Sequence, residues 1–312
     1  MGGSGGMFGS VGSGHAPSEL KDKLRQEAEA SAQQFEAELG KLFGELLSGY
    51  NSRDADETAE RLQTVKDALH EFTDPATSFD THFGGSVAKH TYVDGISDVD
   101  AMLVVRGELA DADPRAVLQH TVDALRKKLD PNVQVSAGRV AITVRFPDGP
   151  EIQLIPSRRD GDVLHVPAWE QNNWSPINPR QFMDGLTKRN RETGGKLIPT
   201  IKLVKAVNAT LPENARLSGY HIESLGVAAF RGYDGECTSV RMLPYFFKKA
   251  SELVMRPMVD RTGQSVHVDQ NLGPEGSPAR VAASHLLARI HQRMVNASAA
   301  KSSERWQGLF DD

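Results

Sequence analysis

The hydrophobic pattern of the chain changes character near residue 178. Upstream, short β-branched segments alternate with helical ones, which is typical of a sheet covered by helices. Downstream the strand signal fades, and the pattern predicts helices over residues 179–190, 196–208, 220–230, 236–255 and 277–299. The sequence therefore predicts an α+β fold with a mixed first half and a helical second half.

A long amphipathic helix is predicted near the start of the chain. From Ser18 to about Leu47 apolar residues recur every three or four positions, forming one apolar stripe. About 30 helical residues span about 45 Å, so we expect this helix to brace the whole molecule. A second helix is predicted from Asp54 to Phe72. Residues 1–16, rich in Gly and Ser, are expected to form a flexible tail, and MGGSGG resembles a cloning remnant.

Strand character is clearest in two segments of the first half. Val99–Val105 is short, apolar and β-branched, and a helix capped by Asp113 with Pro114 at its first position is predicted after it. Residues 139–155 alternate in polarity around the turn PDGP, which predicts an antiparallel hairpin.

Composition narrows the functional class. The chain has 312 residues, 39% of them hydrophobic, which is enough for one large core or two smaller ones. Its net charge of −5 does not favour a stable nucleic-acid partner. The single cysteine, Cys237, fits a reducing compartment. With no 18-residue apolar run and no secretion leader, we expect a cytoplasmic protein without membrane association.

The segment GGSVAKHTYVDGISDVD, residues 84–100, carries the strongest chemical signal. Asp98 and Asp100 are two residues apart on a predicted strand, so both carboxylates point to one face. Adjacent carboxylates repel unless a cation accompanies them, and Mg²⁺ favours one or two carboxylates together with phosphate oxygens. The turn Gly84-Gly85-Ser86 lets the backbone approach a phosphate, and a short helix after it would direct free N–H groups at the anion. Together these features predict a nucleoside-triphosphate site with Mg²⁺, or Mn²⁺, as the cofactor.

Two-metal phosphoryl transfer generally requires a third acidic residue. The second hairpin strand, EIQLIPS, places Glu151 and Gln153 on one face, opposite Ile152 and Leu154. Either side chain could meet the aspartate pair across the sheet.

The stretch GGSVAKHTYVDGISDVDAMLVV resembles the nucleotide-binding signature of the polymerase-β-like nucleotidyltransferases. More narrowly, it is similar to the bacterial cGAS/DncV-like nucleotidyltransferases (CD-NTases), in which a distant aspartate stands three residues before a proline. Here that place is taken by Gln153 in the stretch QLIP. Two explanations compete. Glu151 supplies the missing catalytic and metal-binding carboxylate beside Asp98 and Asp100, or the chain is a catalytically impaired nucleotide-binding paralogue.

The resemblance covers nearly the whole chain after residue 17. LIPTIKLVKAVN resembles the family's helix of phosphate-binding lysines, which implies that role for Lys202 and Lys205; the alternative is an exposed charged face. LSGYHIES resembles the segment that places a serine near the phosphates and a tyrosine against a base. It implies those roles for Ser218 and Tyr220, although Tyr220 could be a core aromatic residue, and it predicts a structural ion pair for Glu223. The stretches VDRTG and ERWQGLFDD also match, and the tryptophan-containing tail is expected to pack back onto the fold.

The resemblance implies a two-lobed nucleotidyltransferase fold. Residues 17–178 would form the catalytic core, with a mixed sheet and the long spine helix, and residues 179–312 would form a helical lobe. Gly85 and Ser86 would hold the β- and γ-phosphates, and Gln153 would still contribute to nucleotide binding.

The implied reaction joins nucleoside triphosphates such as ATP and GTP. The 2′- or 3′-hydroxyl of one nucleotide attacks the α-phosphate of another, and ring closure gives a cyclic di- or oligonucleotide second messenger. In bacterial anti-phage (CBASS) signalling such a product activates a downstream effector. We expect the protein to be a monomer. The alternative enzyme is a template-free RNA terminal nucleotidyltransferase.

Overall fold

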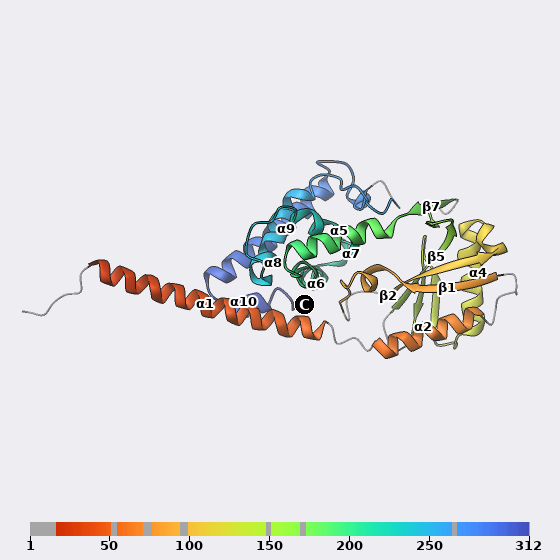
Figure 1. Cartoon of the computed structure of the whole chain (residues 1–312), viewed down its shortest axis with the longest axis horizontal. Coiled ribbons are helices and arrows are strands. Elements are labelled where there is room, and N and C mark those ends of the chain that lie inside the picture. The colour runs from red at the N-terminus through yellow and green to blue at the C-terminus, as the bar shows by residue number, and fades with distance from the viewer. Residues whose placement is uncertain are drawn as a thin grey trace, which may run out of the picture.

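A computed structural model describes residues 17–50, 55–70, 77–93, 99–147, 151–168, 173–263 and 267–311. A lobe built on a sheet lies beside a lobe built of helices, and helix α1 (Pro17–Gly49) projects beyond the helical lobe (Figure 1). The predicted α+β composition is confirmed. In the part of the chain that the structure describes, no helix is long and apolar enough to cross a membrane.

The described residues of the first lobe form a seven-stranded mixed sheet with the central order β1-β2-β5-β4-β3, and β6 and β7 extend it from β5. Strand β2 runs parallel to β5 and antiparallel to β1. The predicted hairpin is confirmed as the antiparallel pair β4–β5. The strands are β1 (Thr77–Phe83), β2 (Val99–Gly107), β3 (Gln134–Ala137), β4 (Ile142–Arg145), β5 (Glu151–Asp160), β6 (Val163–Pro167) and β7 (Trp174–Ile177).

Helices α2 (Ala55–His70) and α4 (Pro114–Lys128) share one hydrophobic cluster with the sheet. Alternate residues of β2 and β5, such as Leu103 and Ile152, point into this cluster and are fully buried. Helix α4 begins as predicted, because the Asp113 side chain accepts a hydrogen bond from the Arg115 amide. The other residues of β2 and β5 are thereby left to face the helical lobe.

The helical lobe contains every helix that the sequence predicts after residue 178. A second hydrophobic cluster unites these helices. They are α5 (Pro179–Glu192), α6 (Leu197–Ala209), α7 (Gly219–Ala229), α8 (Ser239–Leu253) and α9 (Pro278–Ala299). The lobe also contains α10 (Ser303–Gln307), which the sequence did not predict. Among the described residues, four shorter helices lie in connecting segments: α3 (Gly85–Ala88), η1 (Glu108–Asp111), η2 (Glu213–Ala215) and η3 (Gln270–Leu272).

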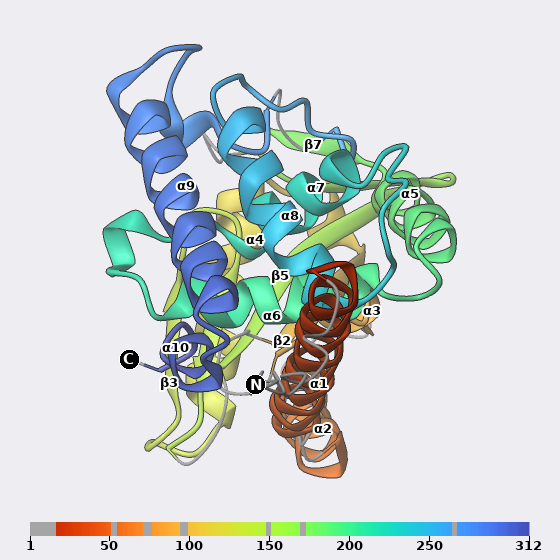
Figure 2. The same cartoon turned by 90° about the vertical axis from the view of Figure 1, so that its left-hand side faces the viewer.

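Helix α1 packs on the helical lobe. Its buried residues Phe35, Leu39 and Phe43 belong to the cluster of that lobe, and Leu20 and Leu24 on its projecting part are exposed. We expected this helix to brace the whole molecule, but its packing anchors it to the helices. The tryptophan-containing tail packs back onto the fold as predicted, since the fully buried ring of Trp306 meets Phe43 of α1 edge-on with centroids 5.5 Å apart. Figure 2 shows the tail helix α10 at the lower end of α9.

The connection between α8 and α9 is anchored by a buried charged residue, Arg280. Its guanidinium donates to Asp269 Oδ2 at 2.7 Å and to the carbonyl oxygens of Val254 and Gly273 at 2.9 and 2.8 Å. His221 Nε2 lies 3.7 Å from the same Asp269 oxygen. Burial, and the neighbouring Arg280, lower the pKa of His221 to about 4, although Asp269 acts in the opposite direction. His221 is therefore neutral in the folded protein at pH 7.

We predict that the fold loses stability as the pH falls from about 6.5 to about 4. Between these pH values His221 takes up a proton in the unfolded chain but not in the folded chain. Acid therefore lowers the free energy of unfolding by up to about 3 kcal/mol. Urea unfolding of the wild type and of His221→Gln at pH 7 and pH 4.5 measures the effect. The variant should lose less stability between the two pH values, whereas His90→Gln, which changes an exposed histidine, should behave as the wild type. Equal losses of stability in the wild type and in His221→Gln would contradict the lowered pKa of His221.

Candidate active site between the two lobes

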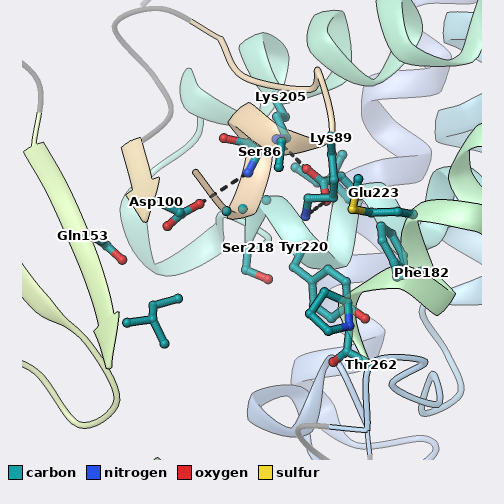
Figure 3. Close-up of a pocket in the computed structure, with 18 of the residues that line it drawn as sticks. Ser86, Lys89, Asp100, Gln153, Phe182, Lys205, Ser218, Tyr220, Glu223 and Thr262 are labelled. Atoms are coloured by element: carbon teal, nitrogen blue, oxygen red, sulfur yellow. Dashed lines mark hydrogen bonds and ion pairs between the residues drawn. The ribbon is translucent and has the colours of Figure 1, made fainter. Parts of the chain in front are cut away.

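A cavity of about 690 Å³ lies where the sheet faces the helical lobe (Figure 3). Its lining comes from the turn before α3, from β2 and β5 on one side, and from α5, α6, α7 and the α8–α9 connection on the other. Gly85, Ser86, Asp100, Gln153, Lys205, Ser218 and Tyr220, all predicted site residues, contribute to this lining. Residues separated by well over a hundred positions thus meet around one space.

The glycine turn rests directly on the end of β2. Gly85 has a φ of +49°, and a Cβ atom at this position would lie 1.5 Å from Asp100 Oδ2. The Gly84 amide donates to the Asp100 carbonyl at 2.9 Å, and the Ser86 amide donates to Asp100 Oδ2 at 3.3 Å. Only glycine permits this backbone conformation together with this close approach.

Ser86 is the phosphate-binding candidate of the turn. Its Oγ is buried and, among the described residues, has no hydrogen-bond partner, although the residue lines the cavity. A buried hydroxyl without a partner costs free energy that an oxygen of a bound ligand can recover. Helix α3 is only four residues long, and the Ser86 N–H is already used by Asp100, so the turn offers fewer free amides than the sequence led us to expect.

The acidic residues do not all meet in the cavity. Asp100 pairs with Gln153 in the parallel register of β2 and β5, so both side chains lie on the cavity face. Asp98 lies outside the described residues. Glu151 lies on the same strand as Gln153, but it does not line the cavity; its Oε1 accepts a hydrogen bond from Arg145 Nε at 2.6 Å. Within the described ranges, no group of three or more acidic, histidine or cysteine side chains could hold a metal ion.

Two oxygen-bearing side chains on the cavity face, Asp100 and Gln153, are suitable ligands for a hard cation. Burial raises the pKa of Asp100, an effect partly offset by the Ser86 amide and by Lys89. A divalent cation beside this carboxylate would remove the cost of burying its charge. The Gln153 amide oxygen, abreast of Asp100, is a neutral ligand of the same hard type. The pair therefore fits part of a Mg²⁺ site, for which Asp98 is the further candidate ligand.

Only one of the two predicted phosphate-binding lysines reaches the cavity. Lys205 lines it and donates from Nζ to Glu223 Oε1 and to the Thr91 carbonyl, each at 2.9 Å. Burial lowers the pKa of Lys205, and Glu223 counteracts that shift. Lys202, half-buried on the same helix, does not line the cavity. Glu223 forms the ion pairs predicted for it, with Lys205 and with Lys89.

Ser218 and Tyr220 lie at the start of α7. Ser218 caps the helix, since its Oγ accepts from the His221 amide at 3.2 Å. The Tyr220 hydroxyl donates to Asp260 Oδ1 at 2.7 Å, and its ring meets Phe182 edge-on with centroids 4.9 Å apart (Figure 3). Burial, together with Asp260, raises the pKa of Tyr220, so the phenol stays protonated. This residue is therefore a packed aromatic that also forms part of the cavity wall, and its contact with a base stays a prediction.

Several lining residues escaped the sequence reasoning, among them Lys89, Phe182 and Thr262. Lys89 stands inside the segment that we singled out, as its one cation, and Thr262 belongs to the stretch VDRTG. Phe182 carries no chemical signal, because it is one of several apolar residues of α5.

Comparison with known proteins agrees with this geometry. Residues 39–190 match the family model of the Second Messenger Oligonucleotide or Dinucleotide Synthetase domain. A search of curated proteins finds no match. Among solved structures, the chain is similar to the CdnC:HORMA-deltaN complex of E. coli MS115-1, with 17% identity, a TM-score of 0.66 and coverage of 84% of this chain and 92% of the other.

Two further structures show the same fold. The Bradyrhizobium diazoefficiens CD-NTase CdnG has a TM-score of 0.62 at 17% identity, and the match covers 80% of this chain and 88% of CdnG. The Vibrio cholerae di-nucleotide cyclase DncV has a TM-score of 0.61 at 13% identity, and the match covers 95% of this chain and 90% of DncV. These likenesses confirm the two-lobed fold and the predicted resemblance. Residues 39–190, just under half of the chain, match the Second Messenger Oligonucleotide or Dinucleotide Synthetase family model, and the chain shares the two-lobed fold of the solved CD-NTase structures.

Proposed function

We propose that the protein joins nucleoside triphosphates into a cyclic di- or oligonucleotide second messenger, in the cavity between its lobes, as part of bacterial anti-phage (CBASS) signalling. The observation that carries this proposal is the turn Gly85-Ser86 resting on Asp100 at the wall of a cavity that also contains Lys205 and Tyr220. Nucleotide-bound neighbours support it: solved structures of CdnC, CdnG and DncV contain ATP, GTP, or both.

Each wall of the cavity has a distinct role in this proposal. Ser86 and the turn bind phosphate oxygens, and Lys205 and Ser218 neutralise and orient the triphosphate. Tyr220 presents its ring to a base, an interaction worth about 1–3 kcal/mol in single-stranded nucleic-acid binders. Asp100, Asp98 and the Gln153 amide would hold Mg²⁺ or Mn²⁺, which when bound offsets the charge of the phosphates. Catalysis then consists mainly of positioning and charge neutralisation, as in phosphoryl transfer generally.

The bond changes are those of nucleotidyl transfer. A ribose hydroxyl oxygen of one nucleotide forms a new bond to the α-phosphorus of the other, the bond to pyrophosphate breaks, and the hydroxyl proton is released. The cavity of about 690 Å³ lies within the usual size range of small-molecule sites, and its lining joins both lobes. A nucleotide bound there would therefore touch the sheet and the helices together.

A second candidate function follows from Gln153. An amide brings no charge to a metal and accepts no proton, and Arg145 already engages Glu151. A protein that binds nucleotide with little turnover is consistent with these two facts.

We predict that Asp100→Asn lowers product formation at least about 100-fold, because losing even an outer-shell partner of a metal costs 10–100-fold. Incubation with labelled triphosphates and Mg²⁺ or Mn²⁺, followed by chromatography, measures it. Cyclic product from the wild type supports the main proposal, extension of added RNA alone would replace it by terminal nucleotidyl transfer, and binding without turnover would favour the second candidate. Unchanged turnover in Asp100→Asn would refute the site.

The same assay decides which residue fills the third metal position. We expect Gln153→Asp to raise turnover, because it restores a carboxylate abreast of Asp100. Glu151→Gln should change turnover little, since Arg145 holds that carboxylate outside the cavity lining. The reverse pattern, no gain in the first and a large loss in the second, would show that Glu151 is the third acid.

A matched pair of glycine variants tests the turn. Gly85→Ala should abolish detectable nucleotide binding, because its Cβ collides with Asp100 and the residue must keep a positive φ. Gly84→Ala should bind nearly as the wild type, since its nearest neighbour is the flexible Met102 Cγ at 3.2 Å. Calorimetric titration with ATP or GTP compares them, and thermal unfolding verifies that both fold. Equal affinities in the two variants would contradict the proposed role of the turn.

A further inference from the structure

A buried ionic cluster joins the two lobes beside the cavity. It consists of Lys89 and Thr91, which follow the glycine turn, and of Lys205 and Glu223, which belong to α6 and α7. Glu223, 1% exposed, accepts hydrogen bonds from Lys89 Nζ and Thr91 Oγ1, and from Lys205 Nζ at 2.9 Å. Lys205 in turn donates to the Thr91 carbonyl at 2.9 Å. The phosphate-binding turn is thus tied to the helical lobe through one carboxylate.

Lys89 occupies a prominent place in this cluster. It lines the cavity, and its Nζ lies 5.3 Å from the ring centroids of both Phe182 and Tyr220 (Figure 3). The rings and Glu223 hold the ammonium group at a defined point of the wall. An ammonium group has three N–H donors, and Glu223 is one acceptor, so donors remain for a ligand oxygen.

The charges of the cluster do not balance. Burial would raise the pKa of Glu223, but the ammonium groups of Lys89 and Lys205 lower it, so the carboxylate is ionised. One buried carboxylate therefore faces two lysines. The other carboxylate on the cavity wall, Asp100, also interacts electrostatically with both lysines, but a cation bound beside Asp100 would engage that charge. The remaining positive charge then points into the cavity and calls for an anionic ligand.

We propose that Lys89 is a further triphosphate-binding residue and that Glu223 is the residue that positions Lys89 and Lys205 at the cavity wall. This inference rests on the proposed function, because it names a ligand for the same cavity. Lys89 thereby takes the role of second phosphate-binding lysine, which the sequence analysis had given to Lys202. Because Glu223 also holds Thr91, the same carboxylate that aims the lysines fixes the end of the glycine turn.

The test uses the full chain with ATP and GTP as triphosphate probes and adenosine and guanosine as uncharged ones. Lys89→Met should weaken triphosphate binding by about 10- to 100-fold, the worth of a hydrogen bond between charged groups. It should leave nucleoside binding within about twofold, and Lys89→Arg should restore part of the loss. The control is Lys196→Met, the same substitution at an exposed residue outside the cavity lining, which should bind as the wild type.

Lys89→Met leaves Glu223 paired with Lys205, so the buried carboxylate is not stranded and the fold should persist; thermal unfolding verifies this. Glu223→Gln should lose triphosphate affinity to a similar extent. If that variant does not fold, the Lys89 variants alone decide. Triphosphate affinity of Lys89→Met equal to that of the wild type overturns the inference while the proposed function stands. A wild type that binds neither triphosphate overturns both.

Discussion

The contact between Gly85 and the Asp100 carboxylate is the constraint on which the site depends. It requires a residue without a side chain and with a positive φ, and it places a turn amide against a strand carboxylate. Because β2 is parallel to β5, fixing Asp100 also fixes Gln153 beside it on the cavity face. One local requirement of the backbone thereby sets the relative positions of the proposed phosphate-binding turn and the proposed metal-binding residues.

The carboxylate of Glu223 extends this arrangement to the other lobe. The helices of the second lobe have their own hydrophobic cluster, separate from the cluster under the sheet. Lys89 and Thr91 reach Glu223 across 134 and 132 sequence positions, so polar contacts rather than a shared core bring the turn to the helices at this point. An anionic ligand bound as proposed would lie beside the ion pairs that hold the two lobes together at this point.

Much of the fold could be predicted because its signals are local. Helical periodicity placed the helices α5 to α9, and Asp113 with Pro114 marked the start of α4. The strands β1, β3, β6 and β7 were not predicted. Strands β3, β6 and β7 are only four or five residues long, β7 contains Pro176, and β1 includes the polar residues Asp80 and His82. Pairing with neighbouring strands therefore decides their structure more than their own pattern does.

The site was predictable where one segment carried it. The turn and Asp100 lie within a single stretch, and Lys205 follows from one helix. The sequence could not tell that Arg145, opposite Glu151 on β4, would take that carboxylate, nor that Lys202 would point elsewhere than Lys205. Both contacts depend on which side chain of another strand or helix lies opposite. The sequence pattern predicts only the face of the strand or helix on which a residue lies.

Glutamine at position 153 is expected to affect triphosphate binding and turnover differently. A triphosphate is repelled by each uncompensated carboxylate in the cavity and attracted by each cation, so a neutral residue abreast of Asp100 leaves its binding intact or strengthens it. A second metal ion, in contrast, depends on carboxylate charge. In the proposed function the cavity would therefore keep its affinity for a triphosphate, while activation of the attacking hydroxyl would fall to Asp98 and Asp100, because Arg145 holds Glu151 outside the cavity lining.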